Sequence, residues 1–113
     1  MTHTAPQRGE IYRINLEPTV GSEQQGRARP CIILTLSTYN TQLRTVGVVP
    51  LTSSPRALLP LIVPMPSAGK TESMALCQQI RTIDKSRIGA LMGKLSDADL
   101  NMLEKQIRLV YGL

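Results

Sequence analysis

The stretch Cys31-Ile32-Ile33-Leu34-Thr35-Leu36 decides the fold of this chain. A continuous apolar run of this kind is typical of a central β-strand that is covered on both faces. Upstream of it, Tyr12, Ile14 and Leu16 alternate with polar residues, a period of two that predicts a half-buried strand ending at Pro18. We therefore expect a β-sheet with a long polar loop, residues 19–29, between its first two strands.

Further β-rich segments follow this pair of strands. Pro50 removes a backbone donor from the next segment, which therefore belongs at a sheet edge or beside a bulge. A turn, or one helical turn, is expected at residues 39–42 and a loop at 67–72. The later strands are expected at 44–52, 58–65 (interrupted by Pro60 and Pro64), 74–83 and 87–95. Six short strands with little helix between them predict a small, strongly curved antiparallel barrel.

The C-terminal segment has the period of a helix instead. Ser96 can cap it, and Asp97 and Asp99 favour its positive end, Asp99 standing where a capping box places an acid. One apolar stripe follows: Leu100, Leu103, Ile107 and Val110. Three more apolar residues widen this face: Met102, Leu109 and Tyr111. Either a partner subunit or a deeper groove on the barrel would explain them.

Length and composition restrict the class of protein. With 113 residues, 42% of them hydrophobic and 19% charged, the chain is expected to form one globular domain over 1–113, with residues 1–7 flexible. Trp and Phe are absent, which argues against an RNA-stacking sheet of the RRM type. A net charge of +5 favours polyanionic partners.

Several classes of site and location are disfavoured by missing residues. No apolar run suits a secretory signal or a membrane helix, so we expect a cytoplasmic protein without membrane contact. Cys31 and Cys77 have no second pair and His3 is the single histidine, which disfavours a zinc site and a two-histidine ribonuclease mechanism. The two cysteines are expected to be buried, reduced thiols rather than a disulfide.

Three polar segments are candidates for chemistry. The loop at 21–29 contains glycines, which allow close backbone approach, and Arg27 and Arg29, which can bind phosphate oxygens. Hydroxyls follow a strand at 51–54, and four basic groups surround a turn at 81–87. Without further information, each could equally be a solvated hairpin tip, an ordinary turn or an exposed charged hairpin.

The ordered set of motifs, however, resembles the MazF/PemK family of toxin endoribonucleases from residue 8 to residue 113. The motifs are RGEIY at 8–12, PTVGSEQ at 18–24, RP at 29–30, YN at 39–40, VPLTS at 49–53, QIRTIDKSR at 79–87, LSD at 95–97 and GL at 112–113. The resemblance implies an SH3-like barrel (the CcdB/PemK-like fold) with a C-terminal helix, working as a homodimer. It also implies cleavage of single-stranded RNA, and so inhibition of translation and growth, with no metal or cofactor.

The family's site residues transfer to this chain position by position. Its catalytic arginine matches Arg29, and its catalytic threonine matches Thr52. The remaining RNA-binding candidates come from the mobile loop, the channel wall and the nearby basic residues: Ser22, Glu23, Gln24, Arg27, Ser53, Gln79, Arg81 and Arg87. The family reaction is attack of the ribose 2′-hydroxyl on the adjacent phosphate, giving 2′,3′-cyclic phosphate and 5′-hydroxyl ends.

This chemistry suits the residue types. The pentacoordinate transition state carries extra negative charge, which a guanidinium can stabilise with two aligned donors. Arg29 is therefore assigned mainly charge stabilisation, with proton delivery left open as a second role, and Thr52 a hydrogen bond to a phosphate oxygen. The general base stays open between Ser53, Glu23 and a water molecule.

Two features depart from the family pattern. The loop reads EQQGRARP, one residue longer than usual, with Gln25 where glycine is common; Arg27 is a second candidate in register, and Pro30 favours Arg29. Gln78 stands where an acid usually precedes the glutamine, which could alter sequence preference.

Partners and alternatives follow from the same resemblance. An antitoxin with an acidic, disordered C-terminal tail would suit the basic surface, with operator DNA bound only through that complex. One alternative is a gyrase poison of the CcdB type, although the C-terminus LVYGL offers no tryptophan for that contact. A second alternative is a barrel that binds RNA or protein without catalysis.

Overall fold

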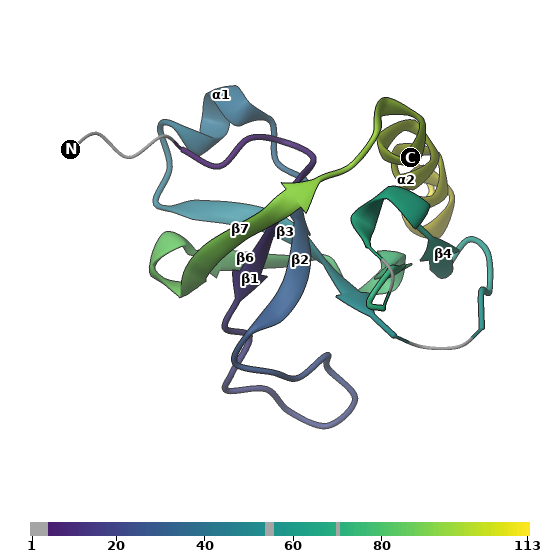
Figure 1. Ribbon diagram of the computed structural model, residues 1–113, viewed down its shortest axis with the longest axis horizontal. Helices are drawn as coiled ribbons and strands as arrows, with labels where there is room; N and C mark the ends of the chain where they lie inside the picture. The colour runs from purple at the N-terminus through teal and green to yellow at the C-terminus, as the bar shows by residue number, and fades with distance from the viewer. Residues whose placement is uncertain (1–4, 54–55, 70) are drawn as a thin grey trace.

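The chain folds as a strongly curved antiparallel sheet with a helix packed on one side (Figure 1). The computed structural model describes residues 5–53, 56–69 and 71–113. The strands of this described part are β1 (Glu10–Ile14), β2 (Arg29–Ile33), β3 (Thr45–Thr52), β4 (Ile62–Pro64), β5 (Met74–Leu76), β6 (Arg81–Asp84) and β7 (Ile88–Lys94). The helices are α1 (Ser37–Asn40) and α2 (Asp97–Tyr111), with 3₁₀ turns η1 (Pro66–Ala68), η2 (Cys77–Gln79) and η3 (Lys85–Arg87). The prediction of a mainly β protein with a C-terminal helix is confirmed.

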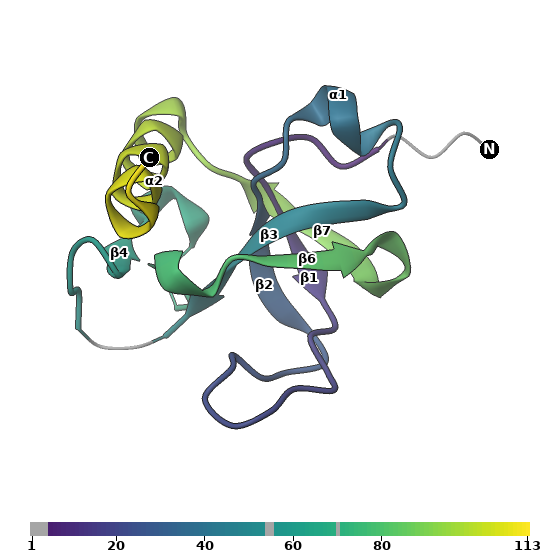
Figure 2. The ribbon, with the colours of Figure 1, turned by 180° about the vertical axis from the view of Figure 1, so that it is seen from behind.

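Strand β3 organises the sheet. The hydrogen-bonded order is β4-β5-β3-β2-β1-β7, and β6 also pairs with β3, beside which it runs in Figure 2. Residues 45–48 of β3 pair with β6, whereas Leu51 and Thr52 pair with β5. The sequence left an edge strand and a bulge open for Pro50; the edge is wrong, because β3 pairs with β2 on one side and with β6 and β5 on the other. Pro50 instead lies where β3 changes partner on its other side.

The prediction of one strand at 74–83 is also wrong. The turn η2 divides this segment into two strands, β5 and β6. The pairing register with β3 shifts by three residues between β5 and β6, which is the length of η2. Pro50 lies opposite this shift. Because proline has no backbone N–H, the inserted turn leaves no N–H of Pro50 without a hydrogen-bond acceptor. The split raises the number of strands from the expected six to seven in the described residues.

Three other boundaries differ from the prediction. The apolar run at 31–36 leaves the strand after Ile33, so its last three residues lie outside β2. The segment at 58–65 forms only the short strand β4, and Leu58 makes one isolated bridge to Ile62. Arg29, assigned to the loop by its polar neighbours, begins β2. In contrast, the helical turn near residue 39 and the strand at 87–95 are confirmed as α1 and β7.

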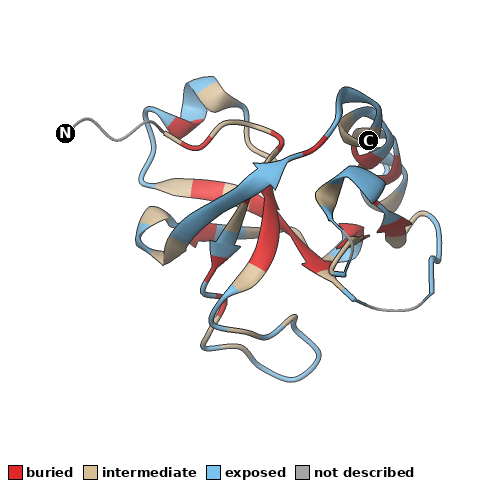
Figure 3. Cartoon of the chain, in the orientation of Figure 1, coloured by how far each residue is buried: buried red, intermediate tan, exposed pale blue. Residues whose placement is uncertain are grey.

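The core lies on both faces of β2 and β3, as the continuous apolar run predicts (Figure 3). On one face Ile32 packs with Val49 and with Leu103 of α2. On the other face, Cys31 and Ile33 pack with residues of β1, β3 and β6. In β1 the expected inward residue Tyr12 is only half-buried, although it packs on the same cluster as Ile14. Ile11 is buried as well, because it faces the other cluster, which includes Leu103 of α2.

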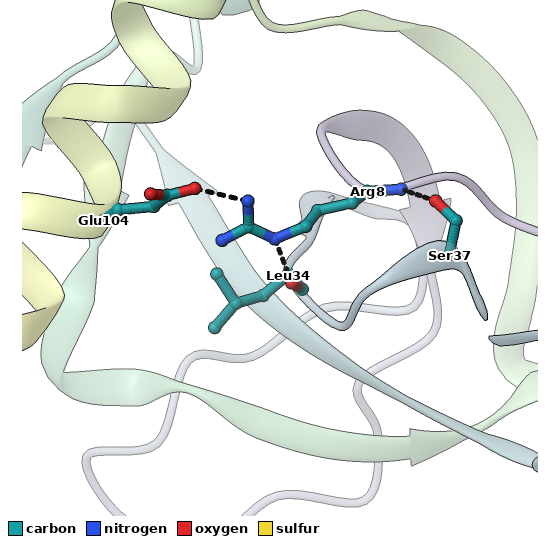
Figure 4. Close-up of polar contacts among 4 residues, drawn as sticks. All are labelled: Arg8, Leu34, Ser37 and Glu104. Carbon is teal, nitrogen blue, oxygen red and sulfur yellow. Dashed lines mark hydrogen bonds and ion pairs between the residues drawn. The ribbon is translucent and has the colours of Figure 1, made fainter. Parts of the chain in front are cut away.

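Arg8 fastens three segments to one another (Figure 4). Its backbone N–H donates to Ser37 Oγ at 2.9 Å, its Nε donates to the Leu34 carbonyl at 2.8 Å, and its Nη1 is ion-paired with Glu104 of α2. Nearby, buried Asn40 donates through Nδ2 to the carbonyl of Pro6, itself buried, at 2.9 Å. Residues 1–4 lie outside the described residues. This range includes His3 and more than half of the segment 1–7 that was expected to be flexible.

Helix α2 has the expected start, with one difference. Ser96 Oγ accepts from the Asp99 N–H at 3.1 Å, as an N-cap does. The Asp99 carboxylate does not complete a capping box; it accepts from Ser67 N and Oγ, at 2.8 and 2.5 Å, and Ser67 Oγ accepts from the Ser96 N–H at 3.0 Å. Ser67 therefore links the helix start to the loop after β4.

The wide apolar face of α2 is not explained by a deeper groove. Met102, Leu109 and Tyr111 remain 41%, 61% and 46% exposed. Within the described part of the chain, neither helix is both long and apolar enough to cross a membrane.

Replacing Ser96 by alanine is expected to lower the free energy of unfolding by about 1 kcal/mol, since the Asp99 N–H loses its acceptor. Urea denaturation followed by circular dichroism measures this change. Ser96→Asp keeps a capping oxygen and should retain most of the stability. An unchanged Ser96→Ala midpoint would show that the cap does not stabilise α2.

Candidate functional site

The loop between β1 and β2 extends away from the sheet (Figures 1 and 2) and is closed at its base by hydrogen bonds. Glu17 Oε2 accepts from the Gly26 N–H at 2.6 Å, and the Leu16 N–H donates to the Gly26 carbonyl at 2.8 Å. A side chain at Gly26 would collide with Arg29, because a Cβ there would lie 2.1 Å from Arg29 Cγ. Gly26 thus allows a close approach to its backbone, as predicted, but the group that approaches is the Arg29 side chain rather than a ligand.

Gln79 fastens the middle of the loop. Its Oε1 accepts from the Gln24 N–H at 2.6 Å, and its Nε2 donates to the Ser22 carbonyl at 3.4 Å. Gln79 is the last residue of η2, so the turn that splits the expected strand also supplies the support for the loop.

A cavity of about 460 Å³ lies between the loop and the η2–β6 segment. Five of the predicted RNA-binding residues line it: Ser22, Glu23, Gln24, Gln79 and Arg81. Gln78, which replaces the usual acid, lines it too. The structure therefore gathers these predicted residues at one site. Within the cavity wall, the Glu23 carboxylate accepts from the Val20 N–H at 2.5 Å.

Arg29 and Thr52 lie on neighbouring strands at the same end of the sheet. Cys31 and Pro50 are the last recorded pair at this end of the β2–β3 ladder, and Arg29 and Thr52 each lie two residues beyond that pair. Thr52 is half-buried and pairs with Met74 of β5, while Ser53 after it is exposed. Ser54, part of the predicted hydroxyl cluster, is outside the described residues.

The Arg29 guanidinium has two partners. Its Nη1 is 2.8 Å from Glu72 Oε1. With the Gln24 amide turned so that its oxygen faces Arg29, that oxygen accepts from Nη2 at 2.7 Å and from Nε at 3.2 Å. Sequence reasoning missed Glu72, which it left in a loop without a role. No local signal could have found it, because the pairing joins segments far apart in the sequence.

Two other predicted arginines hold the base of the loop. Arg81 Nη1 donates to the Leu16 carbonyl at 2.6 Å, and Arg87 Nη1 donates to the Asn15 carbonyl at 3.0 Å. Carbonyl partners fix these side chains without cancelling their charge. Arg27 is exposed and lines a separate hollow beside Glu17, so it does not join the cavity residues.

The cysteines are buried free thiols, as predicted. Burial raises the pKa of Cys31, two residues after Arg29, to about 12, and that of Cys77 to about 11. Both thiols are therefore protonated at neutral pH and are poor nucleophiles or bases. Among residues 5–53, 56–69 and 71–113, no cluster of three His, Cys, Asp or Glu side chains could hold a metal ion.

Comparison with known proteins identifies the family. The model of the PemK-like, MazF-like toxins of type II toxin–antitoxin systems matches residues 7–111. The chain belongs to this family. The resemblance seen in the sequence motifs is thereby confirmed for almost the whole chain.

Individual relatives of this toxin agree with the assignment. Endoribonuclease PemK of Escherichia coli is 36% identical over 99 residues, covering 84% of this chain and 74% of PemK. Endoribonuclease MazF of Staphylococcus saprophyticus is 34% identical over 110 residues, covering 94% and 91%.

Solved structures share the fold. An endoribonuclease from a mycobacterial species, in complex with its cognate antitoxin, has a TM-score of 0.80 and 26% identity, covering 96% of this chain and 97% of that one. MazF from Deinococcus radiodurans has a TM-score of 0.84 at 24% identity, covering 96% and 98%. At 24% identity, the similarity to this MazF shows a shared fold.

Replacing Gln79 by alanine is expected to loosen the loop, because the Gln24 N–H loses its acceptor. Amide exchange at Gln24 should become about three to ten times faster, the effect of one lost hydrogen bond. Hydrogen–deuterium exchange measured by NMR gives the rate at this residue.

Gln79→Glu, which keeps an acceptor oxygen at this position, is the matched control and should exchange more slowly than Gln79→Ala. Equal rates in wild type and Gln79→Ala would contradict the assigned support.

Proposed function

We propose that this toxin is a metal-independent, sequence-specific endoribonuclease that cuts single-stranded RNA in the cytoplasm. Its target is taken to be mRNA, so that cleavage inhibits translation and growth. The observation that carries the proposal is Arg29, which lies at the same end of the β2–β3 ladder as Thr52 and is hydrogen-bonded to the loop that covers the cavity. Two relatives above 30% identity, both named endoribonucleases, support the same activity.

The proposed reaction forms a bond between the ribose 2′-oxygen and phosphorus and breaks the bond to the 5′-oxygen. The 2′-hydroxyl proton passes to a base, and the leaving 5′-oxygen takes up a proton. The products are a 2′,3′-cyclic phosphate and a 5′-hydroxyl. Arg29 stabilises the charge that develops on the phosphate, and the Thr52 hydroxyl holds a phosphate oxygen. Ser53, Glu23 or a water molecule serves as the base.

RNA binding is assigned to the cavity and the basic groups around it. Ser22, Glu23, Gln24 and Gln79 meet the bases and backbone within the cavity, and exposed Ser53, which follows Thr52, is assigned a further RNA contact. Arg81 and Arg87, fixed by carbonyls, keep positive charge available for phosphates, and exposed Arg27 extends this charge outward. Restraint of such an activity requires an antitoxin.

We infer that the antitoxin carries an acidic, disordered C-terminal tail and that operator DNA is bound only by the toxin–antitoxin complex. The +5 charge of the chain favours such a tail. The mycobacterial structural relative was solved with its cognate antitoxin, which supports the existence of a partner of this kind.

The toxin is also proposed to form a homodimer through α2. Met102 and Leu109 are seven residues apart and share one flank of the helix, where both are exposed. Burial of this flank against a second copy would remove apolar surface from water.

Arg29→Ala is expected to lower cleavage about 10²–10³-fold, the scale of one lost transition-state donor. The assay is cleavage of a long, unstructured RNA in EDTA, with primer extension to map the ends. Arg44→Ala, which removes an exposed arginine outside the site, is the matched control and should cleave normally.

Discrete cuts at one short motif, lost in Arg29→Ala, would support the endoribonuclease. Near-normal cleavage by folded Arg29→Ala would refute the assignment of this residue. If the folded toxin does not cleave RNA at all, a supercoiling assay tests the gyrase-poison alternative, and an RNA-retention assay tests binding without catalysis.

Leu109→Glu is expected to shift the toxin from dimer to monomer, because a charge on the shared flank would be buried unpaired. Sedimentation velocity measures the mass. Asn101→Glu introduces the same charge at an exposed polar position of α2 and should leave the dimer intact. A monomeric wild type, or a dimeric Leu109→Glu, would contradict this interface.

A further inference from the structure

We propose that Glu72 is a positioning residue that orients the Arg29 guanidinium for phosphate binding. The proposal rests on the function proposed above, in which Arg29 stabilises the transition state. Glu72 Oε1 lies 2.8 Å from Arg29 Nη1, and the two side chains are 27% and 26% exposed. This partial burial limits the freedom of both side chains and weakens competition from water.

The guanidinium is restrained at three points. Its aliphatic stem packs on Gly26, where only a glycine leaves room. Glu72 contacts Nη1, on one side of the planar group, and the Gln24 oxygen contacts Nε and Nη2 on the opposite edge. An arginine in this arrangement has a fixed direction as well as a fixed location.

The edge held by Gln24 is the one that suits a phosphate. Nε and Nη2 are parallel donors, and such a pair binds two phosphate oxygens at once. Gln24 belongs to the loop, and its side-chain oxygen can be replaced there by a phosphate oxygen. Glu72 can stay on Nη1 during this exchange, so the guanidinium keeps its direction while it changes partner.

Glu72 is well situated to align Arg29 with Thr52. It precedes β5, whose first residue, Met74, pairs with Thr52. The end of β3 carries the proposed threonine, and the segment that leads into its partner strand β5 carries the carboxylate that holds the arginine. The arrangement has a cost, because a carboxylate near the scissile phosphate repels RNA. Glu72 should consequently favour turnover and oppose binding.

Two substitutions separate these effects. In Glu72→Gln the amide oxygen can still accept from Nη1 but the charge is gone, so kcat should stay within about threefold of wild type and KM should fall. In Glu72→Ala the guanidinium loses its support, so kcat should fall about tenfold or more without a rise in KM. Both are measured on a short RNA that contains the mapped cleavage site.

Glu104→Ala is the matched control. It removes the ion pair between Glu104 and Arg8, the other ion pair among the described residues, and so tests whether losing any ion pair lowers kcat. It should leave kcat unchanged. Thermal unfolding shows whether each variant is folded. A kcat of folded Glu72→Ala within about twofold of wild type, the scale of an ordinary surface substitution, would overturn the proposal. The proposed endoribonuclease function would be unaffected by that result.

A second measurement does not depend on cleavage. In ¹⁵N NMR of RNA-free toxin, hindered rotation should give Arg29 separate Nη1 and Nη2 signals in wild type and Glu72→Gln. In Glu72→Ala, where only Gln24 still holds Nε and Nη2, the two signals should exchange faster than in wild type, and an exchange rate equal to that of wild type would count against the proposal. Averaged signals in the wild type would overturn the proposal. If the signals separate as expected but the wild type does not cleave RNA, the proposed function fails and the orienting contact remains.

Discussion

The change of partner along β3 is the constraint on which the rest of the molecule depends. One side of β3 pairs with β2, while the other side pairs first with β6 and then, beyond Pro50, with β5. The three-residue register shift between these partners is taken up by η2, which ends at Gln79. Gln79 in turn supports the loop over the cavity. Sheet geometry and site geometry therefore have the same origin.

The basic residues of the site are fixed in two chemically different ways. Arg81 and Arg87 are held by backbone carbonyls of the segment that leads into the loop. These contacts orient the side chains and leave their charge available to a polyanion. Arg29 is held by a carboxylate and a loop amide, which orient it more strictly and partly offset its charge. The first arrangement suits RNA attraction, and the second suits alignment with one phosphate.

The two departures from the family pattern lie at the loop and the cavity. Gln25, in the longer loop, is exposed, and Gln78 lines the cavity without bringing a negative charge. Gln78 therefore faces the cavity that is proposed to bind RNA, and Gln25 lies in the loop beside it.

Local patterns in the sequence determined that β1, β2 and α2 form, although not every boundary of β2, because periodicity and capping depend on residues a few positions apart. The motif resemblance likewise pointed to Arg29, Thr52 and the loop. Only the tertiary structure decided the split of residues 74–83, the link through Ser67, and the pairing of Arg29 with Glu72. Each of these depends on a contact between distant segments, and no run of neighbouring residues carries the information about such a contact.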